Sequence, residues 1–453
     1  MKKRLYKLAV AVLASVLSLT GCGGVSTEVN TDNTVEEEAR VISDEADPGD
    51  ISAVSNELEE TGEENDPAEL YLKDAITSEN GLGPDAICGA AVGYNGISDE
   101  KLMALVHEHY NAVTLENELK LDCMLGYHND ACPAGSIHEE DLNGESIEVP
   151  TLDHSRADKM LDKILEWNSE NPDNKLKVRG HVLVWHSQAP DWFFREDYDN
   201  EKDYVGREIM DKRMEWYIKS MLLYYTGSDS KYKDLFYGWD VVNEAVSDAT
   251  GSYRKDTDPG AKSTWWHIYQ DNGFILNAFK YANKYAPAGL DLYYNDYNEC
   301  EDKKMAGIIK LIQDVKEEPG TRIDGFGMQG HYNISKPSPD KLSGCAKKYL
   351  EQVDKVMITE LDVRAGSAYD GTDATREEEY LKQAKYLRDL YEAVREIDEG
   401  SGDFAGITTW GVRDCDSWLN SFEKGPQCPL LFDGNYQPKP AFYAFTDPGR
   451  LKD

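Results

Sequence analysis

Short apolar runs alternate with longer amphipathic segments along most of this chain, and this alternation restricts its fold more than any other feature. Eight runs have the length and composition of strands, at 87–92, 112–115, 177–184, 236–242, 290–294, 325–329, 356–358 and 406–409. Segments with helical periodicity lie between them, among them 157–167, 213–225, 265–285, 303–317 and 377–396. Strands that alternate with helices form a parallel sheet. Eight such units predict an α/β fold of the TIM-barrel type, a closed (β/α)8 barrel.

The first 22 residues have the pattern of an export signal. Four basic residues within the first seven precede an apolar stretch at 8–19, which is too short to span a bilayer. The stretch ends in Leu-Thr-Gly-Cys, which resembles the bacterial lipobox, so we expect Cys22 to carry a lipid and to become the new N-terminus. This predicts an extracytoplasmic protein, anchored to the membrane or cell surface by its lipid. An ordinary secretory peptide, which would release the protein to the medium, is the alternative.

Residues 23–80 differ in composition from the rest of the chain. Up to residue 70 the segment is rich in Asp and Glu, lacks aromatic residues and has one basic residue, Arg40. Such a segment buries too little apolar surface to offset its chain entropy, and its like charges extend it. We therefore predict a disordered acidic tether at 23–80 and a folded barrel at 81–453. A polar stretch near 124–154, rich in Gly, Asp and Glu, is predicted to be a loop insertion in the barrel, either functional or locally disordered.

The composition excludes several kinds of partner and cofactor. The formal net charge of −37 and the lack of a basic stripe argue against nucleic-acid binding. No cysteine spacing resembles a zinc site, and no motif indicates a redox or nucleotide cofactor, so we predict neither metal nor cofactor. Cys123 with Cys132, and Cys415 with Cys428, are close enough in sequence to form disulfides in an exported protein. Burial as small apolar side chains is the alternative. We expect a monomer.

Two glutamates stand where the reactive groups of a (β/α)8 barrel gather, at the C-terminal ends of the strands. Glu244 closes the fourth apolar run and Glu360 closes the seventh. Retaining cleavage of a glycosidic bond requires such a pair, with one carboxyl group as acid and the other as nucleophile, about 5 to 5.5 Å apart. The position of this pair predicts a glycoside hydrolase.

Four motifs at these strand ends resemble glycoside hydrolase family 10, the xylanase family. They are Trp-His-Ser-Gln-Ala-Pro at 185–190, Trp-Asp-Val-Val-Asn-Glu-Ala at 239–245, Asn-Asp-Tyr-Asn at 295–298 and Ile-Thr-Glu-Leu-Asp at 358–362. The resemblance covers about 87–445. It implies an endo-β-1,4-xylanase that acts on xylan and xylo-oligosaccharides with retention, through a covalent glycosyl-enzyme intermediate.

The resemblance also implies roles for individual residues. Glu244 corresponds to the acid/base and Glu360 to the nucleophile. His331 corresponds to the histidine that orients the nucleophile, and Asn243 to the amide that binds the sugar 2-hydroxyl. The remaining residues that match substrate-binding positions are Glu116, Asn117, Lys120, His181, Trp185, Gln188, Tyr297, Gln329, Trp410 and Trp418.

One position departs from the family pattern. The family commonly has Trp after the lysine that corresponds to Lys120, whereas Leu121 stands here. We expect that an edge contact on the glycone side is lost. Because the insertion at 124–154 leaves the same loop, we hypothesise that it rebuilds or extends the distant glycone subsites.

Two other functions compete with this interpretation. A barrel glycosidase with another specificity, such as a β-1,4-glucanase, would have the same pair of glutamates, since a fold does not fix a substrate. A non-catalytic lipoprotein that captures glycans would also lie at the cell surface. The second alternative is disfavoured because a binding protein needs neither both carboxylates nor Asn243 and His331 beside them.

Overall fold

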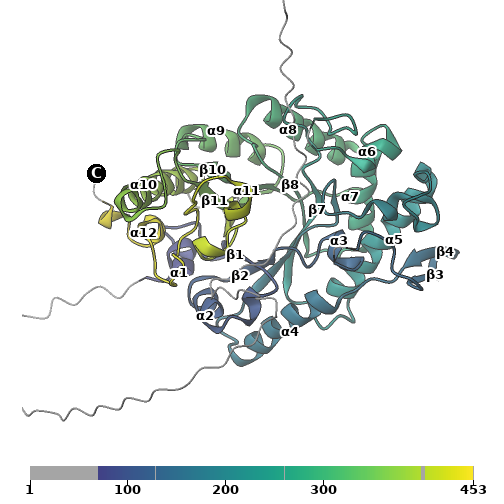
Figure 1. Ribbon diagram of the computed structural model, residues 1–453, viewed down its shortest axis with the longest axis horizontal. Helices are drawn as coiled ribbons and strands as arrows, with labels where there is room; N and C mark the ends of the chain where they lie inside the picture. The colour runs from purple at the N-terminus through teal and green to yellow at the C-terminus, as the bar shows by residue number, and fades with distance from the viewer. Residues whose placement is uncertain (1–69, 128, 260, 399–403, 452–453) are drawn as a thin grey trace, which may run out of the picture. The chain divides into compact units, whose positions relative to one another are not determined.

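The computed structural model describes residues 70–451 except 128, 260 and 399–403. The predicted export signal at 1–22 with Cys22, and the tether up to residue 69, lie outside the described residues. The described part contains a closed barrel of eight parallel strands, in which β12 pairs with β1 and β11 pairs with both β9 and β12 (Figure 1). The predicted (β/α)8 barrel is confirmed. In barrel order the strands are β1 (Ile87–Val92), β2 (Ala112–Leu115), β5 (Lys177–Gly180), β7 (Phe236–Asn243), β8 (Asp291–Asp296), β9 (Gly325–Met328), β11 (Lys355–Arg364) and β12 (Phe404–Thr409).

Helices surround the ring of strands (Figure 1). Their bounds follow from burial and capping. In α4 the buried residues Ala157, Met160, Leu161 and Ile164 recur at helical spacing, which turns one face to the barrel. The Asp99 carboxylate caps the start of α2 by accepting two backbone N–H groups. The surrounding helices are α2 (Glu100–His109), α4 (Ser155–Glu170), α5 (Arg207–Thr226), α7 (Gly273–Tyr285), α8 (Asp302–Glu317), α9 (Pro339–Leu350), α10 (Asp373–Asp398) and α12 (Pro440–Thr446).

The inside of the barrel is a packed core. Ile87, Ala112, Tyr293 and Met357, from four strands, form one buried cluster near the strand starts. Gly325 leaves room for the Tyr293 ring, because a Cβ atom at this glycine would collide with it. This layer closes the N-terminal end of the barrel and leaves the C-terminal ends of the strands as the place for chemistry.

Two predicted elements, one helix and one strand, are each divided in the structure. The helical segment at 265–285 is two helices, because Gln270 adopts a left-handed conformation (φ +58°) after α6 (Thr264–Tyr269) and α7 starts anew at Gly273. The strand at 177–184 ends at Gly180, and a separate strand β6 (Val184–Trp185) pairs with β7.

The end of the predicted tether is also folded. Helix α1 (Leu72–Thr77) lies within 23–80, and its buried residues Leu72, Ala75 and Ile76 have the spacing of one helical face. Helix α1 packs against α12, α2 and β1. The boundary at residue 81 was therefore placed too late, because three apolar residues are enough to attach this segment to the barrel.

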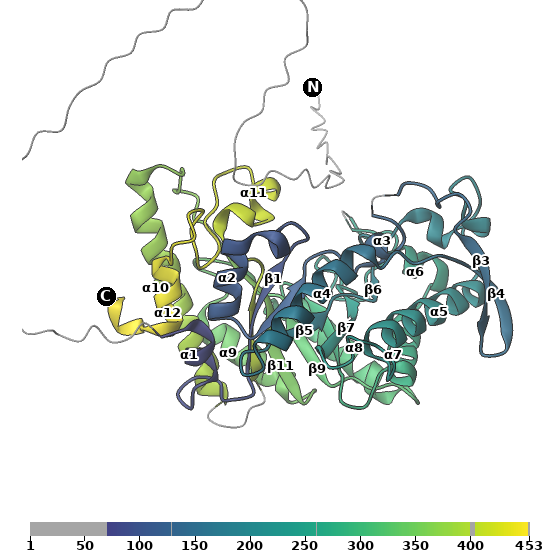
Figure 2. The same ribbon diagram turned by 90° about the horizontal axis from the view of Figure 1, so that it is seen from below.

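The insertion near 124–154 contains a β-hairpin, with β3 (Ile137–Leu142) antiparallel to β4 (Glu145–Pro150). Asn143 and Gly144 both have positive φ (58° and 88°), as the tight turn of a two-residue hairpin requires. The hairpin lies beside α5 on the outer wall (Figure 2). There Trp216 Nε1 donates to Glu140 at 3.0 Å, and Asn143 donates to Glu215 at 3.0 Å.

Two further features of the described residues concern disulfide bonds and membrane-spanning helices. Cys123, Cys132 and Cys428 are thiols, so neither of the disulfides considered from the sequence is formed, and Cys123 and Cys428 are buried. No helix among the described residues is both long and apolar enough to cross a bilayer.

Candidate active site

The two predicted catalytic carboxyl groups lie on strands that two other strands separate in the barrel. Glu244 follows β7 directly, Glu360 lies within β11, and β8 and β9 stand between them. The Glu360 side chain is 6% exposed and that of Glu244 is 13% exposed. Each carboxyl group therefore reaches solvent only through a small part of its surface.

Three amide side chains connect the two carboxyl groups. Asn295 Nδ2 donates to Glu360 Oε1 at 2.7 Å and to Asn243 Oδ1 at 3.0 Å. Gln329 Nε2 donates to Asn243 Oδ1 at 3.1 Å and to Glu244 Oε1 at 3.0 Å. This continuous network fixes the two carboxyl groups relative to one another.

Glu360 is held as an anion. His331 Nε2 lies 3.2 Å from its Oε2, and the other ring nitrogen, Nδ1, lies 3.0 Å from Asp362 Oδ2. Burial alone would raise the pKa of Glu360, but the hydrogen bond from His331 and the positive charges nearby, Arg179 among them, lower it to about 2. Burial alone would lower the pKa of His331, but Asp362 and Glu360 raise it to about 10. At neutral pH the histidine is therefore a cation beside an ionised Glu360.

Glu244 has a different environment. Trp185 Nε1 donates to its Oε2 at 2.9 Å, and the amides of Asn243 and Gln329 donate to its Oε1 at 3.2 and 3.0 Å. His186 Nε2 lies 3.9 Å from Oε2. The cavity behind the carboxyl group measures about 10 Å³, which is room for no more than one water molecule.

Five of the predicted substrate-binding residues form one cluster. Lys120 Nζ donates to Asn117 Oδ1 at 3.1 Å and to Gln188 Oε1 at 2.9 Å, and Gln188 Nε2 donates to Asn117 at 3.1 Å. The same ammonium group lies 5.0 Å from the ring centre of Trp185 and 6.0 Å from that of Trp410. Amide, ammonium and aromatic groups together suit a sugar, which has both hydroxyl groups and apolar C–H faces.

Glu116 lies next to this cluster. It is a half-buried carboxyl group close to Lys120, and desolvation raises its pKa to about 7 although Lys120 acts in the opposite direction. A change near neutral pH therefore alters the charge of this part of the site.

Leu121 does not face the cluster. It is 5% exposed and belongs to the hydrophobic core. A side chain packed in the core offers no contact to a sugar, and the expected loss of a glycone-side contact at this position stays a prediction.

His181 and the one remaining tryptophan, Trp418, lie on the Glu360 side of the site. His181 Nδ1 is 2.8 Å from Asp240, and its ring contacts Trp410 edge to face at 5.4 Å. Trp418 Nε1 donates to Asp362 at 2.8 Å, and its ring lies 5.2 Å from that of His331.

Tyr297 is separate from both groups. Its hydroxyl donates to Asp248 at 2.5 Å and accepts from Arg254 Nη2 at 3.3 Å. Because Arg254 also binds the backbone of Glu244, Tyr297 lies on the acid side of the site.

The sequence interpretation assigned no role to three residues that support the glutamate pair, Asn295, Asp362 and Arg179. Asn295 binds Glu360 directly, and Asp362 binds both His331 and Trp418. Arg179 donates to Asp240 and to the carbonyl of Thr359. A signal for Asp362 was present, because residues two apart in a strand face the same side, as Glu360 and Asp362 do.

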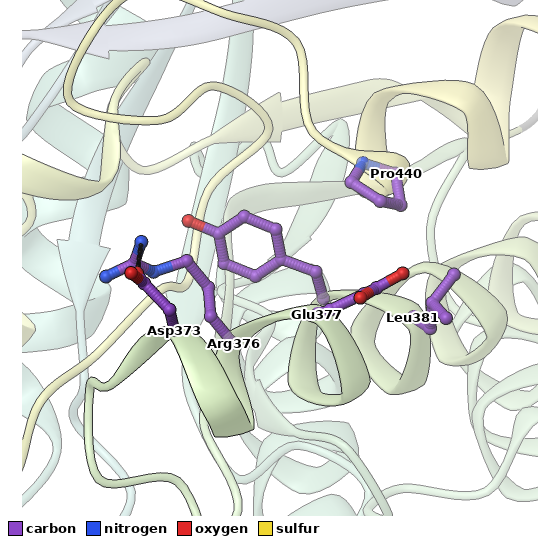
Figure 3. Close-up of a pocket in the computed structure, with 6 residues that line it drawn as sticks. Asp373, Arg376, Glu377, Leu381 and Pro440 are labelled. Atoms are coloured by element: carbon purple, nitrogen blue, oxygen red, sulfur yellow. Dashed lines mark hydrogen bonds and ion pairs between the residues drawn. The ribbon is translucent and has the colours of Figure 1, made fainter.

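A hollow on the outer wall is not part of this site. It has a volume of about 300 Å³ and lies between α10 and α12, with Asp373, Arg376, Glu377 and Leu381 on one side and Pro440 on the other (Figure 3). No catalytic candidate lines it. The described residues also contain no group of three or more His, Cys, Asp or Glu placed to hold a metal ion.

Curated relatives resemble this chain along most of the barrel. Endo-1,4-beta-xylanase Y of Acetivibrio thermocellus is 34% identical over 368 residues, which cover 79% of this chain and 30% of the relative. Endo-1,4-beta-xylanase of Geobacillus stearothermophilus is 31% identical over 363 residues, which cover 78% of this chain and 93% of the relative. The chain thus spans about a third of the length of the longer relative.

Solved structures share the fold. The CBM22-1-GH10 modules of xylanase 10B from Clostridium thermocellum, complexed with xylohexaose, match with a TM-score of 0.67 and 31% identity, covering 83% of this chain and 67% of that one. The GH10 structure from Paenibacillus barcinonensis matches with a TM-score of 0.67 and 29% identity, covering 84% and 98%. The family model for glycosyl hydrolase family 10 matches residues 79–448. The chain, with its glutamate pair on β7 and β11, therefore belongs to glycosyl hydrolase family 10.

Proposed function

We propose that this protein is an endo-β-1,4-xylanase that hydrolyses xylan and xylo-oligosaccharides with retention of configuration. The observation that carries the proposal is the asymmetry of the glutamate pair. Glu360 is held ionised by His331, as a nucleophile requires, whereas the Glu244 carboxyl group accepts hydrogen bonds from neutral donors only, the indole of Trp185 and the amides of Asn243 and Gln329. The names of the relatives support xylan as the substrate.

In the first step, an oxygen of Glu360 attacks the anomeric carbon while Glu244 gives its proton to the leaving oxygen. The glycosidic C–O bond breaks, the shortened sugar chain leaves as an alcohol, and the other part remains as an ester on Glu360. Asn243 donates to the Glu244 carboxyl group and shares Oδ1 with Asn295 and Gln329, so its amide is fixed where it can bind the sugar 2-hydroxyl.

In the second step, Glu244 accepts a proton from water, and the resulting hydroxyl attacks the same carbon. The ester bond breaks and Glu360 returns to its carboxylate form. Two inversions at one carbon give net retention. His331 keeps its proton when Glu360 is esterified, because the Asp362 carboxylate, which does not react, still faces its other ring nitrogen at 3.0 Å.

A β-1,4-glucanase remains the alternative, since the pair serves either sugar. Xylose lacks the hydroxymethyl group of glucose, and Trp418 stands rigidly beside the nucleophile through its bond to Asp362. We expect this ring to crowd a hexose at the cleavage site. Equal kcat/KM on aryl β-xylobioside and aryl β-cellobioside would rule out the xylanase specificity.

The retaining mechanism is tested by the anomeric proton of the first product. We expect the β-anomer to appear first by NMR, and an initial α-anomer would refute the double displacement. Release of reducing sugar from xylan should disappear in Glu360→Ala. It should persist in the control Glu166→Gln, which changes a carboxyl group on the outer helix α4.

We further propose that the protein is exported and held at the cell surface by a lipid on Cys22, with the acidic segment as a spacer. The basic start, the short apolar stretch and the lipobox-like end support this location. Release to the medium is the alternative.

A further inference from the structure

Arg254 is a buried cation near Glu244 that the two steps above do not use. Its side chain is 3% exposed. It ends the loop that begins after Glu244, and this loop folds back on itself. Val246 and Tyr253 form an antiparallel bridge, and the Arg254 N–H donates to the Ala245 carbonyl at 2.7 Å. The far end of the loop therefore brings the Arg254 guanidinium next to the backbone of Glu244.

Three acceptors surround this guanidinium. Its Nε donates to the carbonyl of Glu244 at 2.7 Å. Its Nη2 lies 3.2 Å from the carbonyl of Val246 and 3.3 Å from the hydroxyl of Tyr297. One side chain thus connects the backbone of the proposed acid to the aromatic residue expected on the leaving-group side.

The backbone of Glu244 needs this support. Its φ of +55° lies in the left-handed region, which is unfavourable for a residue with a side chain. Its N–H donates to the Asn295 carbonyl at 2.9 Å, and its carbonyl accepts the bond from Arg254. A charged donor binds a carbonyl more strongly than a neutral one. Holding the peptide groups on both sides of Cα fixes the direction in which the carboxyl group points.

We propose that Arg254 is a positioning residue that aligns Glu244 with the leaving-group oxygen and couples this alignment to the aglycone at Tyr297. The inference rests on the proposed acid role of Glu244. A misaligned acid slows the departure of poor leaving groups, which need its proton. It has little effect on good leaving groups, which depart as anions.

The test compares kcat/KM on two aryl β-xylobiosides, one with phenol and one with dinitrophenol as the leaving group. In Arg254→Gln we expect a loss of about 30-fold or more on the phenyl substrate and of less than about threefold on the dinitrophenyl substrate. Arg254→Lys keeps the charge and can donate to one carbonyl but cannot reach all three acceptors. We expect an intermediate loss with the same selectivity, and this variant serves if Arg254→Gln does not fold.

Arg213 provides a matched control, because it is also buried (6% exposed) and donates to two carbonyls, those of Phe193 and Arg195 at 2.6 and 2.8 Å. Arg213→Lys should lower Tm without changing the ratio of the two rates. If the Arg254 variants lose both rates equally, Arg254 is only structural and the inference is wrong. If the wild-type protein cleaves neither xylobioside, the proposed function fails and the inference fails with it.

Discussion

At the scale of single residues, the charge on His331 determines the pH range in which Glu360 can act. Without this cation the pKa of Glu360 should rise from about 2 toward its usual value of 4.5. The ionised nucleophile is then lost at a higher pH, so the acidic limb of kcat/KM for His331→Asn should move to higher pH. Profiles measured over about pH 3 to 8 test this.

His138→Asn is the control for that experiment. This histidine is also paired with a carboxylate, Glu140 at 2.9 Å, but it lies exposed on the hairpin. Its variant should keep the acidic limb of the wild-type protein. An unchanged limb in His331→Asn would mean that another group sets the charge of Glu360.

The same pair links stability to pH. Because the folded-state pKa of Glu360 is depressed, its contribution is present above its usual pKa of 4.5 and is lost as the pH falls toward 2. The folded-state pKa of His331 is raised, so its contribution is present below 6.5 and is lost as the pH rises toward 10. Both contributions are complete only between these usual values. We expect the difference in Tm between wild type and His331→Asn to be largest between pH 4.5 and 6.5. A difference in Tm that does not change with pH would contradict the coupling between this ion pair and stability.

The two proposed catalytic glutamates could be selected from the sequence because each closes an apolar run, and strand ends meet at one face of a barrel. Their supporting contacts could not. That Asn295 reaches Glu360, or that Arg254 returns to Glu244, depends on loop paths and side-chain directions that no local pattern encodes. Leu121 is a similar case, because the sequence shows a departure from the family pattern there and only the structure shows that the side chain is buried in the core.

At the scale of elements, the β3–β4 hairpin supports the wall of the barrel and contributes no contact to the site among the described hydrogen bonds. Leu142 and Val149 are buried, and Glu140 accepts the indole N–H of Trp216. Replacing 137–150 by a short turn should cost roughly 3 kcal/mol of stability, because the burial of these two apolar side chains against the rest of the barrel is lost. The products from xylohexaose should stay the same.

Trp216→Phe separates the two effects of this deletion. It keeps the hairpin and removes one buried hydrogen bond, so it should cost only about 1 kcal/mol in urea unfolding. A changed product pattern in the hairpin deletion, with an unchanged one in Trp216→Phe, would restore the idea that the insertion extends the glycone subsites.

Helix α1 carries another prediction at this scale. Ile76 is 2% exposed and packs in the main core, so Ile76→Ala should lower the free energy of unfolding by about 2 to 4 kcal/mol. The half-buried Thr77 in the same helix is the control, and Thr77→Ala should cost less than about 1 kcal/mol. If Ile76→Ala and Thr77→Ala both change the free energy of unfolding by a similarly small amount, α1 does not contribute to the core and belongs to the tether.

For most elements the sequence predicted the type, helix or strand, better than the residues at which the element begins and ends. The alternation of apolar and amphipathic runs gave the barrel, because buried parallel strands read as continuous apolar segments. The hairpin was taken as an irregular loop although Asn143-Gly144 stands between two alternating runs, which is the usual signal for a tight turn. Its strands are mostly polar because one face is open to solvent, and this concealed them.

At the scale of the whole molecule, the proposed lipid on Cys22 would hold the barrel at the cell surface. If Cys22 carries a lipid, xylanase activity should stay with washed membranes, since lipid chains add about 0.8 kcal/mol of membrane affinity per buried CH₂ group. In Cys22→Ser we expect this activity to move to the supernatant and labelled palmitate to be lost from the protein. Cys132→Ser, at a half-buried thiol in the barrel, should keep both. Soluble, unlabelled wild-type protein would instead identify an ordinary secretory signal, and the barrel would then reach xylan by diffusion and not from the cell surface.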